Sequence, residues 1–111
     1  MANFFKSETF NLTTTNLTTV LSIGTSAIGI VRSVQASHAT ASNVDVDLYL
    51  KKSGGSDIEI AHVQLNKSSE NMAKNVINLE GGDILKIQAD TANEITGQIS
   101  YLLIDRSQEN G

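Results

Sequence analysis

The chain contains no cysteine and no tryptophan, and aromatic residues make up only 5% of its 111 positions. The lack of cysteine excludes disulfides, thiol nucleophiles and cysteine-ligated metals together. Because small secreted scaffolds often depend on disulfides, this chain has to rely on core burial or on partner subunits. The scarcity of aromatic residues predicts a core of Ile, Leu and Val, in a chain long enough for one ordinary domain.

The chain also has few positively charged residues and no long apolar segment. The formal net charge is -4 and the isoelectric point about 4.9, so the surface does not attract a phosphate backbone and we expect no nucleic-acid partner. The longest apolar runs, such as Leu102–Ile104, are too short to span a bilayer, so no membrane partner is expected. The opening Met-Ala-Asn-Phe-Phe-Lys lacks a basic start followed by a long apolar region, which predicts no signal peptide.

Short alternating segments separated by turn-forming residues are abundant. The clearest unit is Leu79–Ala89, where Gly81 and Gly82 permit a sharp turn, Asp83 can hydrogen-bond the turn backbone, and an alternating strand follows. Eight extended segments are predicted: Phe5–Asn11, Leu17–Ile23, Ala27–Gln35, Val44–Lys51, Asp57–Leu65, Asn71–Ile77, Ile84–Ala89 and Ile95–Ile104. Regular short strands with turns between them predict an all-β fold, a single antiparallel β-sandwich of jelly-roll-like form.

Two of these segments, Val44–Lys51 and Asp57–Leu65, show how the faces are assigned. In the first, every second residue is aliphatic and is predicted to face inward. In the second, Ile58 and Ile60 are predicted to face inward. A strict two-residue turn between the segments would place an inward residue opposite an outward one. A longer loop or a bulge is therefore predicted, and it aligns Leu50 with Ile58.

The two ends of the chain are assigned separately from the sandwich domain, which is predicted to span residues 17–106. Residues 1–16 are predicted to form either an edge strand or an extended arm that pairs with a neighbouring subunit by strand addition. Residues 107–111 are predicted to form a flexible C-terminal tail. Within the domain, Ser69–Leu79 has an alternative as a short helix, because its apolar residues also have helical spacing.

Two histidines, His38 and His62, are the side chains that titrate near neutrality. A serine-type triad needs a hydroxyl, a histidine and an acid that converge. The chain has no Gly-x-Ser-x-Gly elbow and no other nucleophile motif. Surface or rim positions are therefore predicted for both histidines, and no catalytic residue is assigned.

Four carboxylates, those of Asp45, Asp47, Asp57 and Glu59, are predicted to lie near one another on the outer face of two strands. Such a group is typical of Ca²⁺ sites in sandwich loops, and paired carboxylates also serve glycoside hydrolysis. However, the chain has no Asp-x-Asp-x-Asp-Gly loop and no aromatic platform for a sugar, and lysines beside the loop balance the charge. A solvated face is favoured, so no metal or cofactor is assigned, while Ca²⁺ binding at Asp45 and Asp47 stays open.

Five segments carry a family resemblance. They are Leu-Thr-Thr-Thr-Asn-Leu-Thr-Thr-Val (12–20), Ala-Ile-Gly-Ile-Val-Arg-Ser-Val-Gln (27–35), Asn-Val-Asp-Val-Asp-Leu-Tyr-Leu (43–50), Leu-Glu-Gly-Gly-Asp-Ile-Leu-Lys-Ile-Gln-Ala (79–89) and Ile-Ser-Tyr-Leu-Leu-Ile (99–104). In this order they resemble small β-sandwich structural proteins of tailed-bacteriophage particles, especially those of marine and cyanobacterial phages. The chain departs from the pattern at Gly24–Ser26, where a proline-containing turn is expected, because it has no proline.

The resemblance implies a non-enzymatic virion component that is made in the host cytoplasm and assembled on the particle in several copies. The expected role is a capsid decoration or cement protein that binds and stabilises the head shell. The expected partners are the major capsid protein or other virion proteins, with a homo-oligomer, favoured as a trimer, and no cofactor. The alternative is a neck, tail or fibre-associated module that binds a receptor or carbohydrate, for which Tyr49 and Tyr101 are the available tyrosines.

Overall fold

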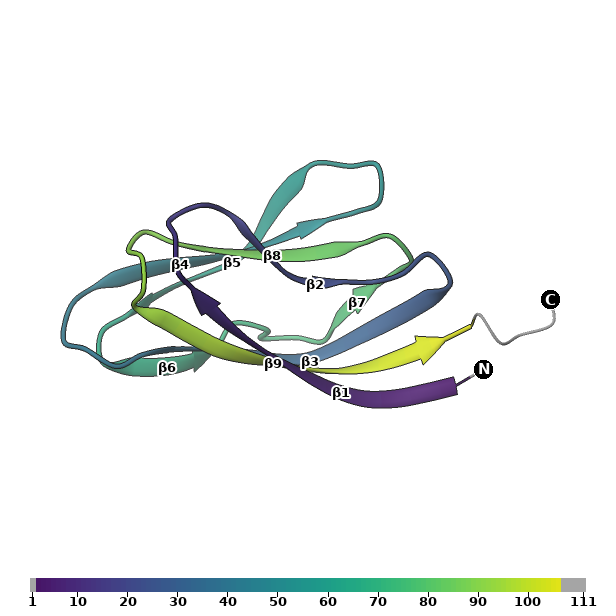
Figure 1. Cartoon of the computed structure of the whole chain (residues 1–111), viewed down its shortest axis with the longest axis horizontal. Helices are drawn as coiled ribbons and strands as arrows, with labels where there is room; N and C mark the ends of the chain where they lie inside the picture. Colours follow the sequence, from purple (N-terminus) through teal and green to yellow (C-terminus); the bar gives the residue numbers. More distant parts are fainter. Residues whose placement is uncertain (1, 107–111) are drawn as a thin grey trace.

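Nine β-strands in two antiparallel sheets form the fold of residues 2–106, the part of the chain that the computed structural model describes (Figure 1). The strands are β1 (Ala2–Leu12), β2 (Thr18–Ser22), β3 (Ala27–His38), β4 (Val44–Lys51), β5 (Asp57–Leu65), β6 (Ser68–Asn71), β7 (Ile77–Leu79), β8 (Ile84–Ala89) and β9 (Ile95–Asp105). The predicted all-β antiparallel sandwich is confirmed. Residues 2–106 contain no helix of the length and apolarity that crossing a membrane requires.

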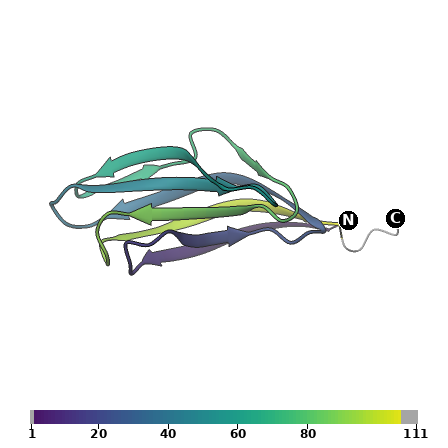
Figure 2. The same cartoon turned by 90° about the horizontal axis from the view of Figure 1, so that it is seen from above.

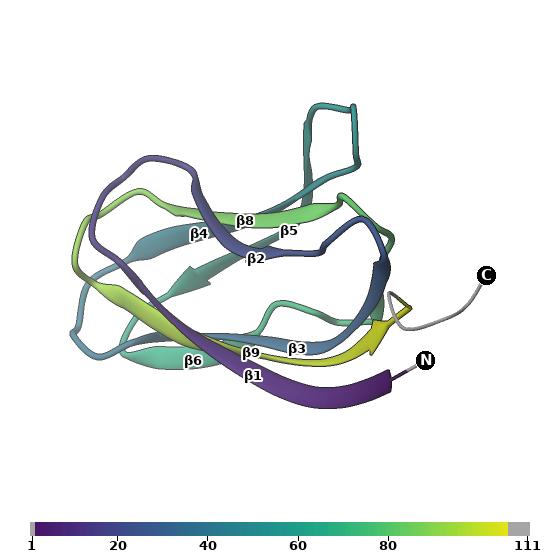
Figure 3. The same cartoon turned by 45° about the vertical axis from the view of Figure 1, so that its right-hand side comes forward.

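The order of the strands in the two sheets is that of a jelly roll. Sheet A has the order β1-β9-β3-β6, with β7 also paired to β3, and sheet B has the order β2-β8-β4-β5. Figure 3 shows the two sheets as stacked layers, and Figure 2 shows the strands running along the long axis of the molecule. When β6 and β7 are taken as one interrupted strand, every connection except the β4–β5 hairpin crosses from one sheet to the other, as in a double-sheet jelly roll. The predicted jelly-roll-like form is therefore confirmed.

The core between the sheets is built from aliphatic residues that alternate with outward-facing polar ones. In β4, Val44, Val46 and Leu48 are fully buried, and in β8 Leu85 and Ile87 are as well. Each such side chain contributes about 1.5–3 kcal/mol by leaving water. Aromatic residues contribute little to the described core, which agrees with the composition.

Single extra residues interrupt the strand pairing at Val20 of β2, at Arg32 of β3 and at Ile60 of β5. A β-bulge of this kind lets two residues three positions apart face the same way, whereas a regular strand places them on opposite faces. On β3 the bulge keeps both Val31 and Val34 in the core, where each is fully buried. Arg32, the extra residue, is exposed.

The predicted register between β4 and β5 is confirmed. The predicted burial of Ile58 and Ile60, near the start of β5, is wrong. Leu50 pairs with Ile58 across the loop of residues 52–56, as expected. However, Ile58 is 59% exposed and Ile60 is 41% exposed. Ile60 is the bulged residue, and the β4–β5 hairpin projects beyond the two layers (Figures 1 and 3), so the opposite sheet does not cover Ile58.

Only the two ends of Asn71–Ile77, the segment predicted as one strand, are strand residues: Asn71 ends β6 and Ile77 begins β7. Residues 72–76 form a bend between them, and the helical alternative does not form there. The Asn71 side chain takes over part of the backbone pairing, because its Oδ1 accepts hydrogen bonds from the N–H groups of Val34 at 2.9 Å and Ala73 at 3.0 Å. An asparagine side chain competes with the backbone in this way wherever its oxygen can reach the N–H groups. Strand propensity alone did not reveal this competition.

At the amino terminus, residues 2–12 form an edge strand within the same chain. β1 pairs with β9 along its whole length, from Ala2 opposite Asp105 to Leu12 opposite Ile95. The pairing of this strand with a neighbouring subunit stays a prediction. The predicted tail at 107–111 lies outside the described residues.

Candidate interaction surface

Asp83 joins the loops at the end of the sandwich where β1 begins and β9 ends, called here the termini end. Its side chain is 1% exposed. Oδ1 accepts a hydrogen bond from the N–H of Ser53 at 3.0 Å, Oδ2 accepts one from the N–H of Glu80 at 2.8 Å, and the Lys52 ammonium pairs with Oδ2. Burial alone would raise the pKa of Asp83, but the hydrogen bonds from Lys52, Glu80 and Ser53 outweigh it and hold that pKa below its ordinary value of 3.8.

The glycines before Asp83 let the loops of the termini end approach closely. Gly82 has a φ of +90°, and a Cβ there would lie 2.8 Å from the Ser53 hydroxyl oxygen. A Cβ on Gly81 would lie 2.4 Å from the carbonyl oxygen of Thr25. The N–H of Gly82 also donates to the carbonyl of Ile23 at 2.9 Å. The predicted glycine turn is confirmed, and it fixes this corner of the sandwich.

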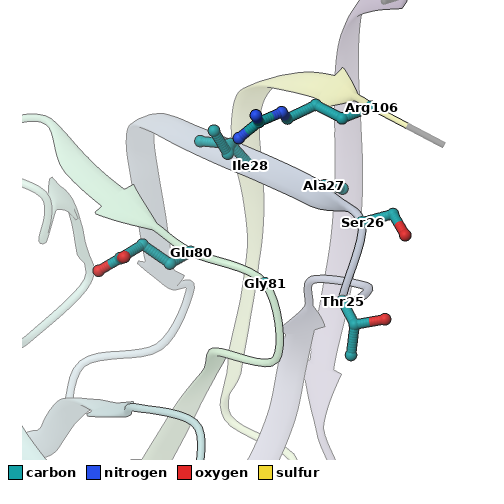
Figure 4. A pocket seen from close by; sticks show the side chains of 7 residues that line it. All are labelled: Thr25, Ser26, Ala27, Ile28, Glu80, Gly81 and Arg106. Atoms are coloured by element: carbon teal, nitrogen blue, oxygen red, sulfur yellow. The ribbon is translucent and has the colours of Figure 1, made fainter. Parts of the chain in front are cut away.

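Figure 4 shows a hollow beside this corner in which the Arg106 side chain extends over Ile28. Glu80 points away from the turn of Thr25 and Ser26 in the same view. The hollow is lined by Thr25, Ser26, Ala27, Ile28, Glu80, Gly81 and Arg106. These lining residues include no histidine and no cysteine, so the described hollow offers no group that exchanges protons near neutrality.

His38 links the loops at the opposite end of the sandwich, called here the far end, and its predicted surface position is wrong. The residue is 2% exposed. Nδ1 lies 3.2 Å from the carbonyl oxygen of Glu94, and Nε2 lies 3.0 Å from the Ser42 hydroxyl and 2.9 Å from the Ser42 carbonyl oxygen. The imidazole therefore ties the end of β3 to the β3–β4 and β8–β9 loops. The burial could not be read from sequence, because it arises from contacts 56 residues apart.

Ser42, His38 and the Glu94 carboxylate converge in the order of a catalytic triad, which the sequence did not indicate. The Glu94 Oε2 lies 3.6 Å from His38 Nδ1. A triad histidine has to reach the leaving group to protonate it. The His38 side chain is 0% exposed, so it cannot do so, and the arrangement acts as a structural link.

The four carboxylates considered for Ca²⁺ do not converge on one point. Asp45 accepts a hydrogen bond from the Gln64 amide at 3.1 Å, and Asp57 pairs with Lys86 at 3.1 Å. Asp47 instead pairs with His62, which is exposed as predicted, and Glu59 lies beside them. The hydrogen bond that His62 donates to the Asp47 carboxylate raises the pKa of His62 above its ordinary value of 6.5.

The two tyrosines that a carbohydrate-binding module would use are poorly placed for it. Tyr101 is buried on the inner face of sheet A, with 6% of its surface exposed. Tyr49 is half-buried on the outer face of sheet B, opposite Glu59. A sugar-stacking platform needs an exposed ring face, and neither tyrosine presents a fully exposed one.

Sheet A carries an apolar surface on its outer side at the termini end. The register places Phe5 of β1 beside Leu102 of β9 and Leu102 beside Ile30 of β3, and it places Ile104 beside Ile28 in the next row. Phe5 is 78% exposed and the other four are half-buried. We call these five residues the apolar face. Soluble proteins rarely leave contiguous apolar patches to water unless a partner covers them.

A second exposed apolar region lies along the edge of sheet B. A groove runs between Ile60–Val63 of β5 and residues 72–77, which form the β6–β7 bend and the start of β7. Val76 on its wall is 58% exposed. Because β5 is an edge strand of sheet B, part of its backbone is available for pairing beside the groove.

Comparisons with known proteins place the fold but not the family. No protein-family model matches the chain, and no curated protein matches its sequence. Among solved structures, it is similar to a chain of the acidic stable capsid of Helicobacter pylori bacteriophage KHP30, with 12% identity, a TM-score of 0.60, and coverage of 96% of this chain and 90% of that chain. It is also similar to a chain of Bacillus endospore appendages, described as a novel family of disulfide-linked pili. There the identity is 12%, the TM-score 0.52, and the coverage 92% of this chain and 84% of that chain. At such identities the likeness establishes a shared fold.

Proposed function

We propose that this chain is a non-enzymatic structural component of tailed-bacteriophage particles, a decoration or cement protein that binds and stabilises the head shell. The observation that carries the proposal is the apolar face, which lies on the outer side of a completed sandwich. The fold shared with a chain of the KHP30 capsid and the sequence resemblance to virion proteins support it. Because one fold hosts many functions, the surface chemistry carries more weight than the fold.

The apolar face would act by burial against the major capsid protein or another virion protein. Burial of apolar surface stabilises a contact by roughly 25 cal/mol per Å². A single small contact of this kind is weak, but several copies held in one oligomer bind together far more tightly. A trimer is the assembly that the virion resemblance favours. The edge strands β1, β2 and β5 offer additional backbone pairing between copies.

A matched pair of charge substitutions on β9 tests the apolar face. Leu102→Lys places an ammonium in the apolar face, while Gln98→Lys places the same charge four residues away on the same side of the same strand. Leu102→Lys should weaken binding to head shells that lack this protein by tenfold or more (about 1.4 kcal/mol). Gln98→Lys should bind like the unchanged chain. Equal binding by both variants would remove the apolar face from the proposal.

Particles of the phage that encodes this chain test the virion role itself. Mass spectrometry of purified particles should find the chain in many copies, and a cryo-electron microscopy map should place it on the head shell. Its absence from purified particles would overturn the proposal, and density on the tail alone would move the protein from head to tail. Sedimentation of the isolated chain measures the oligomer, with a trimer as the expected species.

A further inference from the structure

The β5 bulge brings together two side chains that a regular strand would separate. Glu59 and His62 are three positions apart, so they would point to opposite faces without the extra residue Ile60. With the bulge, Glu59 pairs with Tyr49 and His62 pairs with Asp47 on β4. Both β5 side chains therefore join Asp47 on the outer face of sheet B.

Three different donor groups meet at this point. Atoms of Asp47, Glu59 and His62 that can ligate a metal all lie within 4.8 Å of one another. The Asp47 side chain is 24% exposed and that of His62 is 53% exposed, so the group is open on one side to water. The neighbouring acidic residues do not belong to it, because Asp45 bonds to Gln64 and Asp57 pairs with Lys86.

We propose that Asp47, Glu59 and His62 bind a divalent transition-metal ion of the zinc class. An imidazole nitrogen together with two carboxylate oxygens suits Zn²⁺, which commonly takes three protein ligands and completes its coordination with water. Ca²⁺ and Mg²⁺ prefer oxygen ligands alone, so the histidine selects against them. The metal would take the place of the proton that now joins His62 to Asp47.

The electrostatic surroundings favour a cation at this point. The strand register places the carboxylates of Asp45, Asp47, Asp57 and Glu59 on the same outer face of β4 and β5. A surplus of negative charge therefore acts at the outer face of β4 and β5. The nearby Lys86 does not neutralise the donor group directly, since it pairs with Asp57. The proposal rests on this geometry alone and is independent of the virion role.

Calorimetric titration of the purified full chain with ZnCl₂ at pH 7 tests the proposal. One Zn²⁺ per chain should bind, and His62→Gln and Glu59→Gln should each weaken binding about tenfold or more. The matched control is Asp45→Asn, which removes a carboxylate two residues from Asp47 on the same face. Asp45→Asn should bind Zn²⁺ within about threefold of the unchanged chain, because that carboxylate acts only through its field.

Nuclear magnetic resonance separates a built site from a lone surface histidine. Zn²⁺ should shift the ring signals of His62 and leave those of the buried His38 unchanged. No measurable Zn²⁺ binding would overturn the proposal. So would a Glu59→Gln variant that binds as well as the unchanged chain, since His62 alone would then explain the binding. Ca²⁺ binding as tight as that of Zn²⁺ and unaffected by His62→Gln would also overturn it.

Discussion

The outer face of sheet A changes character half-way along the same three strands. At the termini end, neighbouring residues of β1, β9 and β3 are apolar, as in the row Phe5, Leu102 and Ile30. Toward the far end, the rows become polar: Ser7, Ser100 and Ser33, then Thr9, Gln98 and Gln35, then Asn11, Thr96 and Ser37. The backbone pairing is antiparallel throughout, so the difference lies in the side chains alone.

Folding constrains the side chains on the inner face of sheet A more strongly than those on its outer face. Register is set by the inner face, where a slip of one residue would expose the core. The outer face has no such constraint, and serine, threonine and glutamine suit it well at the far end. The apolar rows at the termini end are therefore not a requirement of the sandwich, and this is the physical reason to read them as a contact surface.

The loops at the termini end are held by the buried Asp83, and those at the far end by the buried His38. Of the substitutions considered, the removal of the Asp83 carboxylate should reduce the stability of the chain most. Asp83→Ala leaves the N–H groups of Ser53 and Glu80 without their acceptor and Lys52 without a buried partner. We expect a loss of about 2–4 kcal/mol in the free energy of unfolding, measured by urea denaturation. Glu80→Gln is the control, because the Glu80 side chain is 78% exposed and should matter little. Equal stability of Asp83→Ala and the control would show that the loops hold without the carboxylate.

At the far end, His38→Ala should destabilise the chain somewhat less than Asp83→Ala does at the termini end. The substitution removes a fully buried ring and its contacts with Glu94 and Ser42, but the carbonyl groups that it frees lie near loops that water can reach. We expect a loss of about 1–3 kcal/mol in the same urea experiment. A loss larger than that of Asp83→Ala would reverse the ranking of the two ends.

Gly82→Ala should cost about 1–2 kcal/mol, because alanine is strained at positive φ. The φ of Gly82 is +90°, and the added methyl group would also press on Ser53. Gly24→Ala is the matched control in the neighbouring loop, since a Cβ there meets nothing within 4 Å. Thermal unfolding of the two variants should differ clearly, and equal midpoints would contradict the close packing inferred for this corner.

The sequence predicts the sandwich well because alternation reports burial directly, and it predicts β4, β5 and β8 with their observed bounds. The sequence-based prediction fails where a single residue changes the strand pairing of its neighbours. The bulge at Ile60 and the Asn71 side chain both replace regular pairing, and neither has a clear local signal in the sequence. His38 depends on a contact with Glu94, 56 residues away, so its surroundings follow only from the completed fold. The Asp47–Glu59–His62 group depends on the bulge at Ile60, which places Glu59 and His62 on one face of the hairpin.

Acid should loosen the termini end before the far end. The folded pKa of Asp83 lies below its ordinary value of 3.8, so the unfolded chain takes up this proton first as the pH falls. The contribution of the carboxylate is therefore complete above pH 3.8 and is lost as the pH falls below it toward the folded pKa. Hydrogen exchange should show the amides of Ser53 and Glu80 losing protection in that range. The amide of Asn93 should keep its protection, because it donates to the carbonyl of Leu12, which does not titrate. Asp83→Asn should abolish the difference between the two ends, and simultaneous loss of protection at both ends of the unchanged chain would contradict a local role for Asp83.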